Sequence, residues 1–231
     1  MNFKIILTVV VLVFCLFCGA LVIQSGLFAH CSGQSGCILL QNAAANVSDD
    51  ANAPAMSAGE MKPPGAVTYT AENAPFEIVT LGSKDSKSGY NFELELSSKG
   101  AAVRSATFSG FDDRNYNDPK PLRILSPVDL GAGYEVLSLA NTNFIFVERQ
   151  IQLPLGRLNW QQVSVDTASD GTQTSRWQAE IKTSAGESAV RLIKIYKVFT
   201  GRFDFECELT IENLLPQIEK IRFDLTGLTG M

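Results

Sequence analysis

The chain has few of the groups from which enzyme sites and nucleic-acid surfaces are built. It contains a single histidine, His30, so a Ser-His-Asp arrangement would have to use that residue as its base. No run of Lys or Arg occurs, and a net charge of −5 disfavours binding to a phosphate backbone. No His/Cys cluster has the spacing of a zinc site, and no glycine-rich phosphate loop precedes a helix. We therefore expect no enzyme activity, no cofactor, no metal and no nucleic-acid partner.

Cysteine is too scarce for a disulfide scaffold. Cys15 and Cys18 lie inside an apolar run, where small packing residues are expected rather than a redox pair. Cys207 lies in a strand pattern and is expected to be buried as a small hydrophobic residue. Cys31 and Cys37 follow the apolar run in a Gly- and Ser-rich segment, and they could form a disulfide in an oxidising compartment. The sequence leaves that pairing open.

Long apolar runs are also missing, with one exception near the N-terminus. Residues 5–23 read IILTVVVLVFCLFCGALVI and contain no charge. A helix of roughly 20 apolar residues crosses the hydrocarbon core of a bilayer, whereas the apolar core of a signal peptide is roughly 7–15 residues long. No A-x-A cleavage pattern closes the run. We therefore predict an uncleaved transmembrane anchor over residues 1–28, whose spanning helix includes Ile5, Val13 and Ile23.

Charge and composition predict what flanks this anchor. Lys4 precedes it, and neither Lys nor Arg occurs between Gln24 and Met61. The positive-inside rule therefore places the N-terminus in the cytoplasm and the rest of the chain on the outer side of the membrane. Residues 29–75 are rich in Gly, Ser, Ala, Asn and Pro without periodicity, a composition that cannot bury enough apolar surface to fold. We expect a flexible tether there.

Beyond the tether the pattern is that of β-strands. YNFELEL (90–96) alternates apolar and polar residues, as half-buried strands do. AVRLIKIYKVF (189–199) and DFECELTIEN (204–213) are two long strand patterns joined by a tight turn. No amphipathic helix is evident after residue 23. The predicted fold class for residues 76–231 is all-β, an antiparallel twisted β-sandwich, preceded by the single transmembrane α-helix.

Two groups of residues could bind a ligand on such a sandwich. Asp112 and Asp113, with Asp118 nearby, could hold calcium, but neighbouring loop residues usually point apart and the EF-hand spacing is missing. A solvated loop is the better interpretation. Trp160 and Trp177 could form a sugar-stacking platform, although isolated tryptophans in strands more often pack in a core.

Three motifs follow the anchor in an order that points to a known family. They are SSKGAAVRSATFSGF (97–111), KIYKVFTGRFDFECELTIEN (194–213) and RFDLTGLTG (222–230). The chain resembles the N-terminal part of bacterial YidC-type membrane protein insertases, which consists of the first transmembrane anchor, a tether and the periplasmic β-domain. The resemblance implies a mutarotase-like sandwich, of which this chain is expected to hold a first part truncated at Met231.

The same resemblance implies a role in the insertion and folding of proteins of the bacterial inner membrane. The expected partners are the lipid bilayer, Sec translocon components and nascent membrane proteins, with the β-domain in the periplasm. In the family, a bundle of five transmembrane helices carries the insertase groove. This sequence has no further apolar run to match it, so no insertase site residue is carried over. The alternative is a membrane-tethered β-sandwich that binds glycans or an extracytoplasmic protein.

Overall fold

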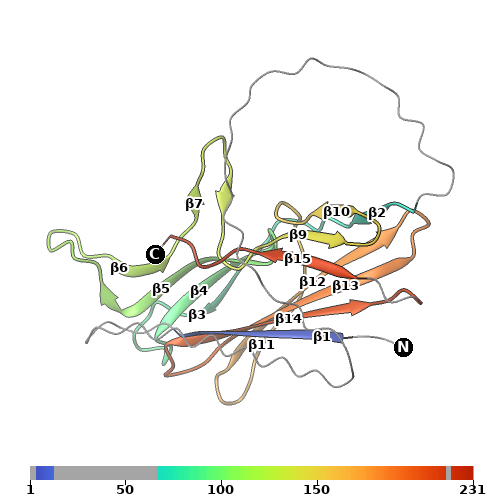
Figure 1. Cartoon of the computed structure of the whole chain (residues 1–231). Helices are drawn as coiled ribbons and strands as arrows, with labels where there is room; N and C mark the ends of the chain where they lie inside the picture. The colour runs from blue at the N-terminus through green and yellow to red at the C-terminus, as the bar shows by residue number, and fades with distance from the viewer. Residues whose placement is uncertain (1–3, 13–66, 217–219, 231) are drawn as a thin grey trace. The chain divides into compact units, whose positions relative to one another are not determined.

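The computed structural model describes residues 4–12, 67–216 and 220–230, with side chains from residue 67 onward. The chain divides into two units, Met1–Ser25 with Thr68–Met231 and Gly26–Val67, and the description below concerns the first. Every helix or strand element in the described ranges is a β-strand, and the strand pairs are antiparallel (Figure 1). The predicted all-β, antiparallel fold class is confirmed.

The main sheet has six strands and is built from the long alternating patterns of the sequence. Its order is β1 (Lys4–Leu12), β14 (Asp204–Asn213), β13 (Ser188–Val198), β12 (Gln173–Thr183) and β11 (Gln161–Thr167), with β2 (Tyr69–Ala71) also paired to β12. Along β12, buried and partly exposed residues alternate, because successive side chains of a strand point to opposite faces. The turn between β13 and β14 contains Gly201 at φ 69°, a conformation that glycine adopts without strain.

Three smaller sheets complete the fold. One has the order β3 (Ile78–Gly82), β4 (Phe92–Ser97), β5 (Ala102–Asp112) and β6 (Pro121–Leu125). A second has the order β10 (Ile151–Pro154), β9 (Asn141–Phe146) and β15 (Ile221–Leu225). The third is a hairpin of β7 (Val128–Asp129) and β8 (Glu135–Val136). The motif at residues 90–96 thus forms β4, and the strand pair predicted at residues 189–213 forms β13 and β14.

The core joins the main sheet to the two larger of these sheets. The rings of Phe92 on β4 and Phe205 on β14 lie 6.4 Å apart, and Tyr69 on β2 stacks on Phe146 of β9 at 4.2 Å. Burying one such large apolar side chain stabilises a fold by about 1.5–3 kcal/mol. Apart from Lys194, the largest fully buried side chains are aromatic: Trp160, Trp177, Tyr196, Phe92, Phe144, Phe146 and Phe205. Apolar faces of different sheets therefore meet in one core, as in a sandwich.

The N-terminal segment differs from the predicted helix. Lys4–Leu12 forms strand β1, antiparallel to β14 from Lys4↔Glu212 to Leu12↔Asp204. This segment is rich in Ile, Val and Thr, whose branched side chains favour extended backbone, and an unbroken apolar run does not distinguish a strand from a helix by periodicity. Val13 and Ile23, also placed in the predicted helix, lie outside the described residues. No helix in the described ranges is long and apolar enough to cross a membrane.

The predicted tether also overlaps the sheet at its C-terminal end. Tyr69–Ala71 lies within the range assigned to the tether, yet it forms β2 opposite residues 181–183 of β12. Tyr69 is 6% exposed, and its ring packs on Phe146. A three-residue strand is too short to give an alternating pattern, and the Pro- and Gly-rich residues before it hide its start.

Candidate functional site

A hollow of about 370 Å³ opens beside the β7–β8 hairpin. The turn Gly131–Gly133 contributes to its wall and has positive φ at all three residues, 87°, 50° and 74°. The Asp129 carboxylate accepts the Gly131 N–H at 2.8 Å and closes this turn. The side chains with polar or aromatic groups around the hollow are Lys99, Tyr134, Glu135, Thr142, Arg157 and Thr226.

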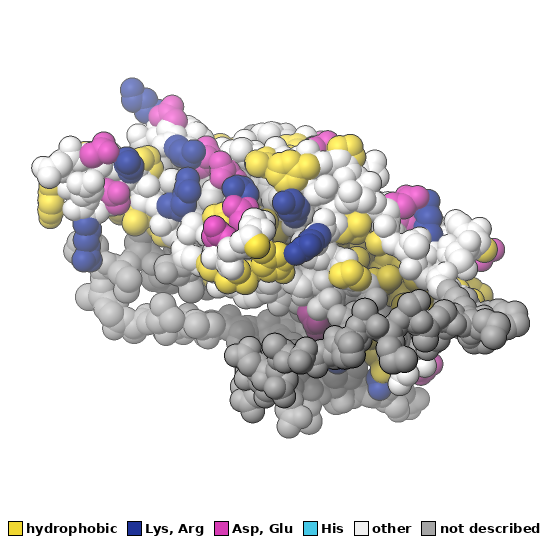
Figure 2. All heavy atoms as spheres, turned by 90° about the horizontal axis from the view of Figure 1, so that it is seen from above, with side chains coloured by type: hydrophobic (Ala, Val, Ile, Leu, Met, Phe, Trp, Pro, Cys, Tyr) yellow, Lys and Arg dark blue, Asp and Glu magenta, His cyan; other side chains and the backbone are white. Residues whose placement is uncertain are grey.

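Two cations line this hollow without a carboxylate partner among the described residues. They are Lys99 and Arg157, and each faces an aromatic ring, at 5.5 and 5.2 Å from the ring centroids. The one carboxylate of the lining, Glu135, is already bound by Arg104 at 3.0 Å. Figure 2 shows a face on which Lys and Arg side chains lie beside hydrophobic ones. The hollow is thus suited to bind an acidic group of a ligand, although the net charge of the whole chain is −5.

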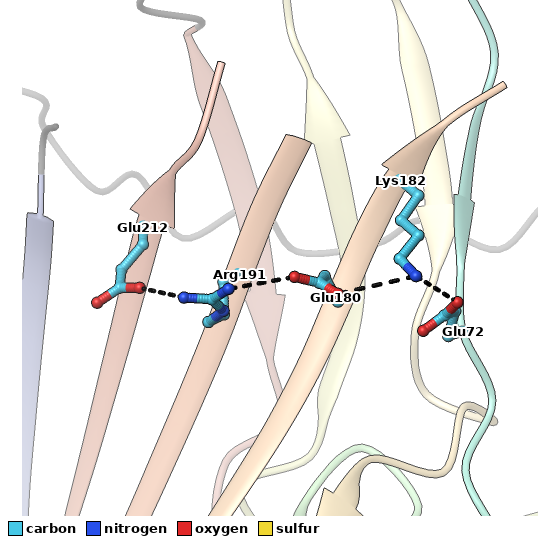
Figure 3. A network of polar contacts seen from close by, with 5 residues as sticks. All are labelled: Glu72, Glu180, Lys182, Arg191 and Glu212. Atoms are coloured by element: carbon cyan, nitrogen blue, oxygen red, sulfur yellow. Dashed lines mark hydrogen bonds and ion pairs between the residues drawn. The ribbon is translucent and has the colours of Figure 1, made fainter. Parts of the chain in front are cut away.

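A row of alternating charges crosses the main sheet (Figure 3). Lys182 contacts Glu72 at 2.6 Å and Glu180 at 3.9 Å, and Arg191 contacts Glu180 at 3.3 Å and Glu212 at 3.4 Å. The hydrogen bond from Lys182 to Glu72 raises the pKa of that lysine. Each pair is partly exposed and therefore weak, and the row joins oppositely charged side chains of neighbouring strands. We call these five residues the charge ladder; it ends at Glu212 on β14.

The comparison with protein families now decides the identity of the domain. The family model described as YidC periplasmic domain matches residues 90–218, which is more than half of the chain. The chain belongs to the YidC periplasmic domain family. The matched range extends from just before β4 to just beyond β14, so it includes β4 to β14 and leaves β1, β2, β3 and β15 outside. Comparisons with curated proteins and with solved structures gave no match.

The two tryptophans of this YidC periplasmic domain are core residues. Trp160 is 1% exposed and Trp177 is fully buried, so neither offers a face to a sugar. Their indole nitrogens have no hydrogen-bond partner within the described ranges. The core interpretation is confirmed, and the glycan-binding alternative loses the residues on which it rested.

The three aspartates lie at the solvated loop between β5 and β6, as the better interpretation predicted, with Asp112 as the last residue of β5. Asp112, Asp113 and Asp118 are exposed. One carboxylate oxygen of Asp113 accepts the backbone N–H groups of Asn115 and Lys120 at 3.1 and 3.3 Å, and it therefore shapes the turn. Within the described ranges, no group of three His, Cys, Asp or Glu residues could hold a metal ion.

The cysteines divide into one described residue and four that lie elsewhere. Cys207 is 2% exposed and free, and burial raises the pKa of its thiol, which confirms the expected small buried residue. Cys31 and Cys37, the predicted disulfide pair, lie outside the described residues, as do Cys15 and Cys18.

Lys194 is a buried charge that the sequence interpretation missed. It is 0% exposed on β13, and its ammonium donates to the Leu139 carbonyl and, at 3.0 Å, to the Asn141 side-chain oxygen. Burial lowers its pKa to about 8. The alternation of β13 places Lys194 at an inward position, in step with Leu192, so the period-two pattern contained the signal. The residue links the main sheet to the segment that enters β9.

Proposed function

We propose that the chain is the membrane-anchored outer part of a YidC-type insertase and acts in the insertion and folding of inner-membrane proteins. The observation that carries this proposal is the match of residues 90–218 to the YidC periplasmic domain. Residues 1–28 are the proposed anchor, with the N-terminus in the cytoplasm. Residues 29 to about 68 are the proposed tether, and the β-domain lies in the periplasm.

The anchor and strand β1 use the same residues. Residues 5–12 cannot span the bilayer as a helix and pair with β14 as a strand at the same time. We therefore assign β1 to the chain outside the bilayer and the spanning helix to the anchored chain. The length of the apolar run, residues 5–23, supports the spanning helix of the anchored chain.

The partners that we propose are the lipid bilayer, nascent membrane proteins and Sec translocon components. The hollow supports a contact with acidic groups of such a partner, since Lys99 and Arg157 face it without carboxylates of their own among the described residues.

A membrane fractionation experiment tests the anchoring. The full chain is expressed in bacteria, and its membranes are washed with alkaline carbonate and treated with protease from the outer side. We expect the chain to stay in the membrane and the β-domain to be digested only when the outer side is accessible. Release by carbonate would remove the anchor from the proposal.

A crosslinking experiment tests the role in insertion. A photoreactive amino acid replaces Tyr134, which is 40% exposed at the hollow, and ribosome-bound nascent chains are supplied to the membranes. We expect crosslinks to a nascent inner-membrane protein and fewer to a nascent secreted protein of equal length. The matched control carries the probe at Tyr116, which is 99% exposed in the loop between β5 and β6. Equal labelling from the two positions would contradict a partner site at the hollow.

A further inference from the structure

The outer edge of β14 has the properties of a surface that accepts an added strand. β14 has ten residues, contains no Pro or Lys, and pairs with β13 without a register shift. Natural proteins usually protect such an edge with charged side chains, a bulge or a proline, and of these β14 has only the charges, at Glu206, Glu208 and Glu212. The partner strand at this edge is β1, which pairs with it position by position. The backbone of β14 is therefore a straight template for one more antiparallel strand.

The core-side positions of this edge are apolar. In an antiparallel pair, residues directly opposite each other share a face of the sheet. The alternate β14 residues Phe205, Cys207, Leu209 and Ile211 are buried, and the register places Val11, Val9, Leu7 and Ile5 opposite them. An incoming segment with apolar residues at every second position thus continues the apolar face of the main sheet.

The opposite face of the same edge selects a cation. The charge ladder alternates in sign across the sheet and ends at Glu212, whose side chain is 27% exposed and contacts Arg191 from one side only (Figure 3). The register partner of Glu212 is Lys4. A Lys or Arg at the first position of an added strand therefore extends the alternation by one more charge, whereas a Glu there faces Glu212 across the pair.

From these observations we propose that the β14 edge binds an extended segment of a nascent membrane protein in which Lys or Arg precedes alternating apolar residues. The class of partner rests on the proposed function, and the recognition rests on the edge itself. In the anchored chain, residues 5–12 lie in the bilayer and the edge is open. The incoming segment takes the place of β1, which likewise begins with Lys4 and has apolar residues at the core-side positions 5, 7, 9 and 11.

The test uses the full chain in mild detergent, with β1 displaced by the double substitution Leu7→Pro and Val9→Pro. Proline removes a backbone donor and disrupts pairing inside a sheet. The probes are two synthetic peptides, KIILTVVVL and EIILTVVVL, each followed by the same polar tail. Amide hydrogen exchange of residues 204–213 is followed by mass spectrometry. We expect the double variant to exchange faster than the original chain and the lysine peptide to restore protection.

The charge preference provides the matched controls. The glutamate peptide is expected to bind about fivefold more weakly than the lysine peptide, and Glu212→Lys is expected to reverse that order. Glu148→Lys makes the same charge change at an exposed turn between β9 and β10 and should leave the order as it was. Equal affinities of the two peptides, or protection outside residues 204–213, would overturn the proposal.

A second variant avoids proline in case the double substitution prevents folding. Glu212→Lys in the chain with β1 intact should speed exchange in β14, and the added substitution Lys4→Glu should slow it again. If the added substitution brings no recovery, the charge selection is wrong. These measurements need no membrane, so they test recognition by the edge separately from the anchoring. If the carbonate test fails while the lysine peptide still protects residues 204–213, the edge recognises the segment, but β1 and not a nascent chain occupies it.

Discussion

The two sides of the main sheet are built differently: β11 is an edge strand, whereas β14 has β1 paired along its outer edge. The β11 edge has seven residues, a register shift between Gln162 and Ser164, and two exposed valines, Val163 and Val165. The β14 edge is longer, has no register shift on either side, and buries its alternate apolar residues. A bulge twists an edge strand and discourages further pairing. The sheet thus ends at β11, whereas β14 accepts a further strand on its outer side.

The largest expected difference concerns the apolar residues of the two edge strands. Phe205→Ala on β14 should lower the free energy of unfolding by about 3–5 kcal/mol, because the ring is fully buried between Phe92 and Tyr196. Val165→Ala on β11 should change it by less than about 0.5 kcal/mol, because that side chain is 44% exposed. Urea denaturation of both variants measures the contrast. Similar losses would mean that the β11 edge is covered in solution.

Sequence patterns predicted the strands better than their pairing. The alternation of β4, β13 and β14 was sufficient to place them, and the same alternation marked Cys207 as buried. Pairing depends on contacts between distant residues. For example, β15 joins β9 through Ile221↔Phe146, and no local pattern encodes that choice. The hollow also depends on contacts between distant residues, because Lys99, Tyr134 and Arg157 come from separate loops and meet only in the folded chain.

The difference at the N-terminal segment, between a predicted membrane helix and the strand β1, has another cause. Its length and lack of charge favour a membrane helix, while its β-branched residues favour a strand, and the surroundings decide between the two. The structure supplies the open edge of β14 as a partner for the strand. The sequence of this segment does not show whether such an edge is available to pair with it.

A second prediction compares the buried and exposed lysines of the main sheet. Burial lowers the pKa of Lys194 to about 8 from its ordinary value of 10.5, so between these pH values the unfolded chain binds more protons than the folded one. The free energy of unfolding should therefore rise with pH across this window, by about 3 kcal/mol, and stay flat below it. Lys194→Met should abolish the rise, as measured by urea denaturation at each pH.

Lys182 on the charge ladder should behave in the opposite direction. Its pKa is raised by the hydrogen bond to Glu72, so its contribution is present below its unfolded pKa and is lost as the pH rises through the folded value. The side chain is accessible to water, and the effect should be small. Lys182→Met is the control for Lys194→Met: it should leave the rise between pH 8 and 10.5 in place. If it removed that rise, Lys194 would not be its source.

The smallest expected change in the free energy of unfolding comes from removing a charge of the charge ladder. Glu180 contacts both Lys182 and Arg191, so Glu180→Gln removes the carboxylate at the centre of the row. The free energy of unfolding should fall by about 0.5–1 kcal/mol at low salt and by less at high salt, because salt screens partly exposed pairs. Asp166→Asn, on the exposed part of β11, makes the same kind of change away from the ladder and should have no measurable effect. If the effect of Glu180→Gln does not depend on salt, the role of Glu180 is packing. The charge ladder would then not explain a preference for Lys or Arg at the β14 edge.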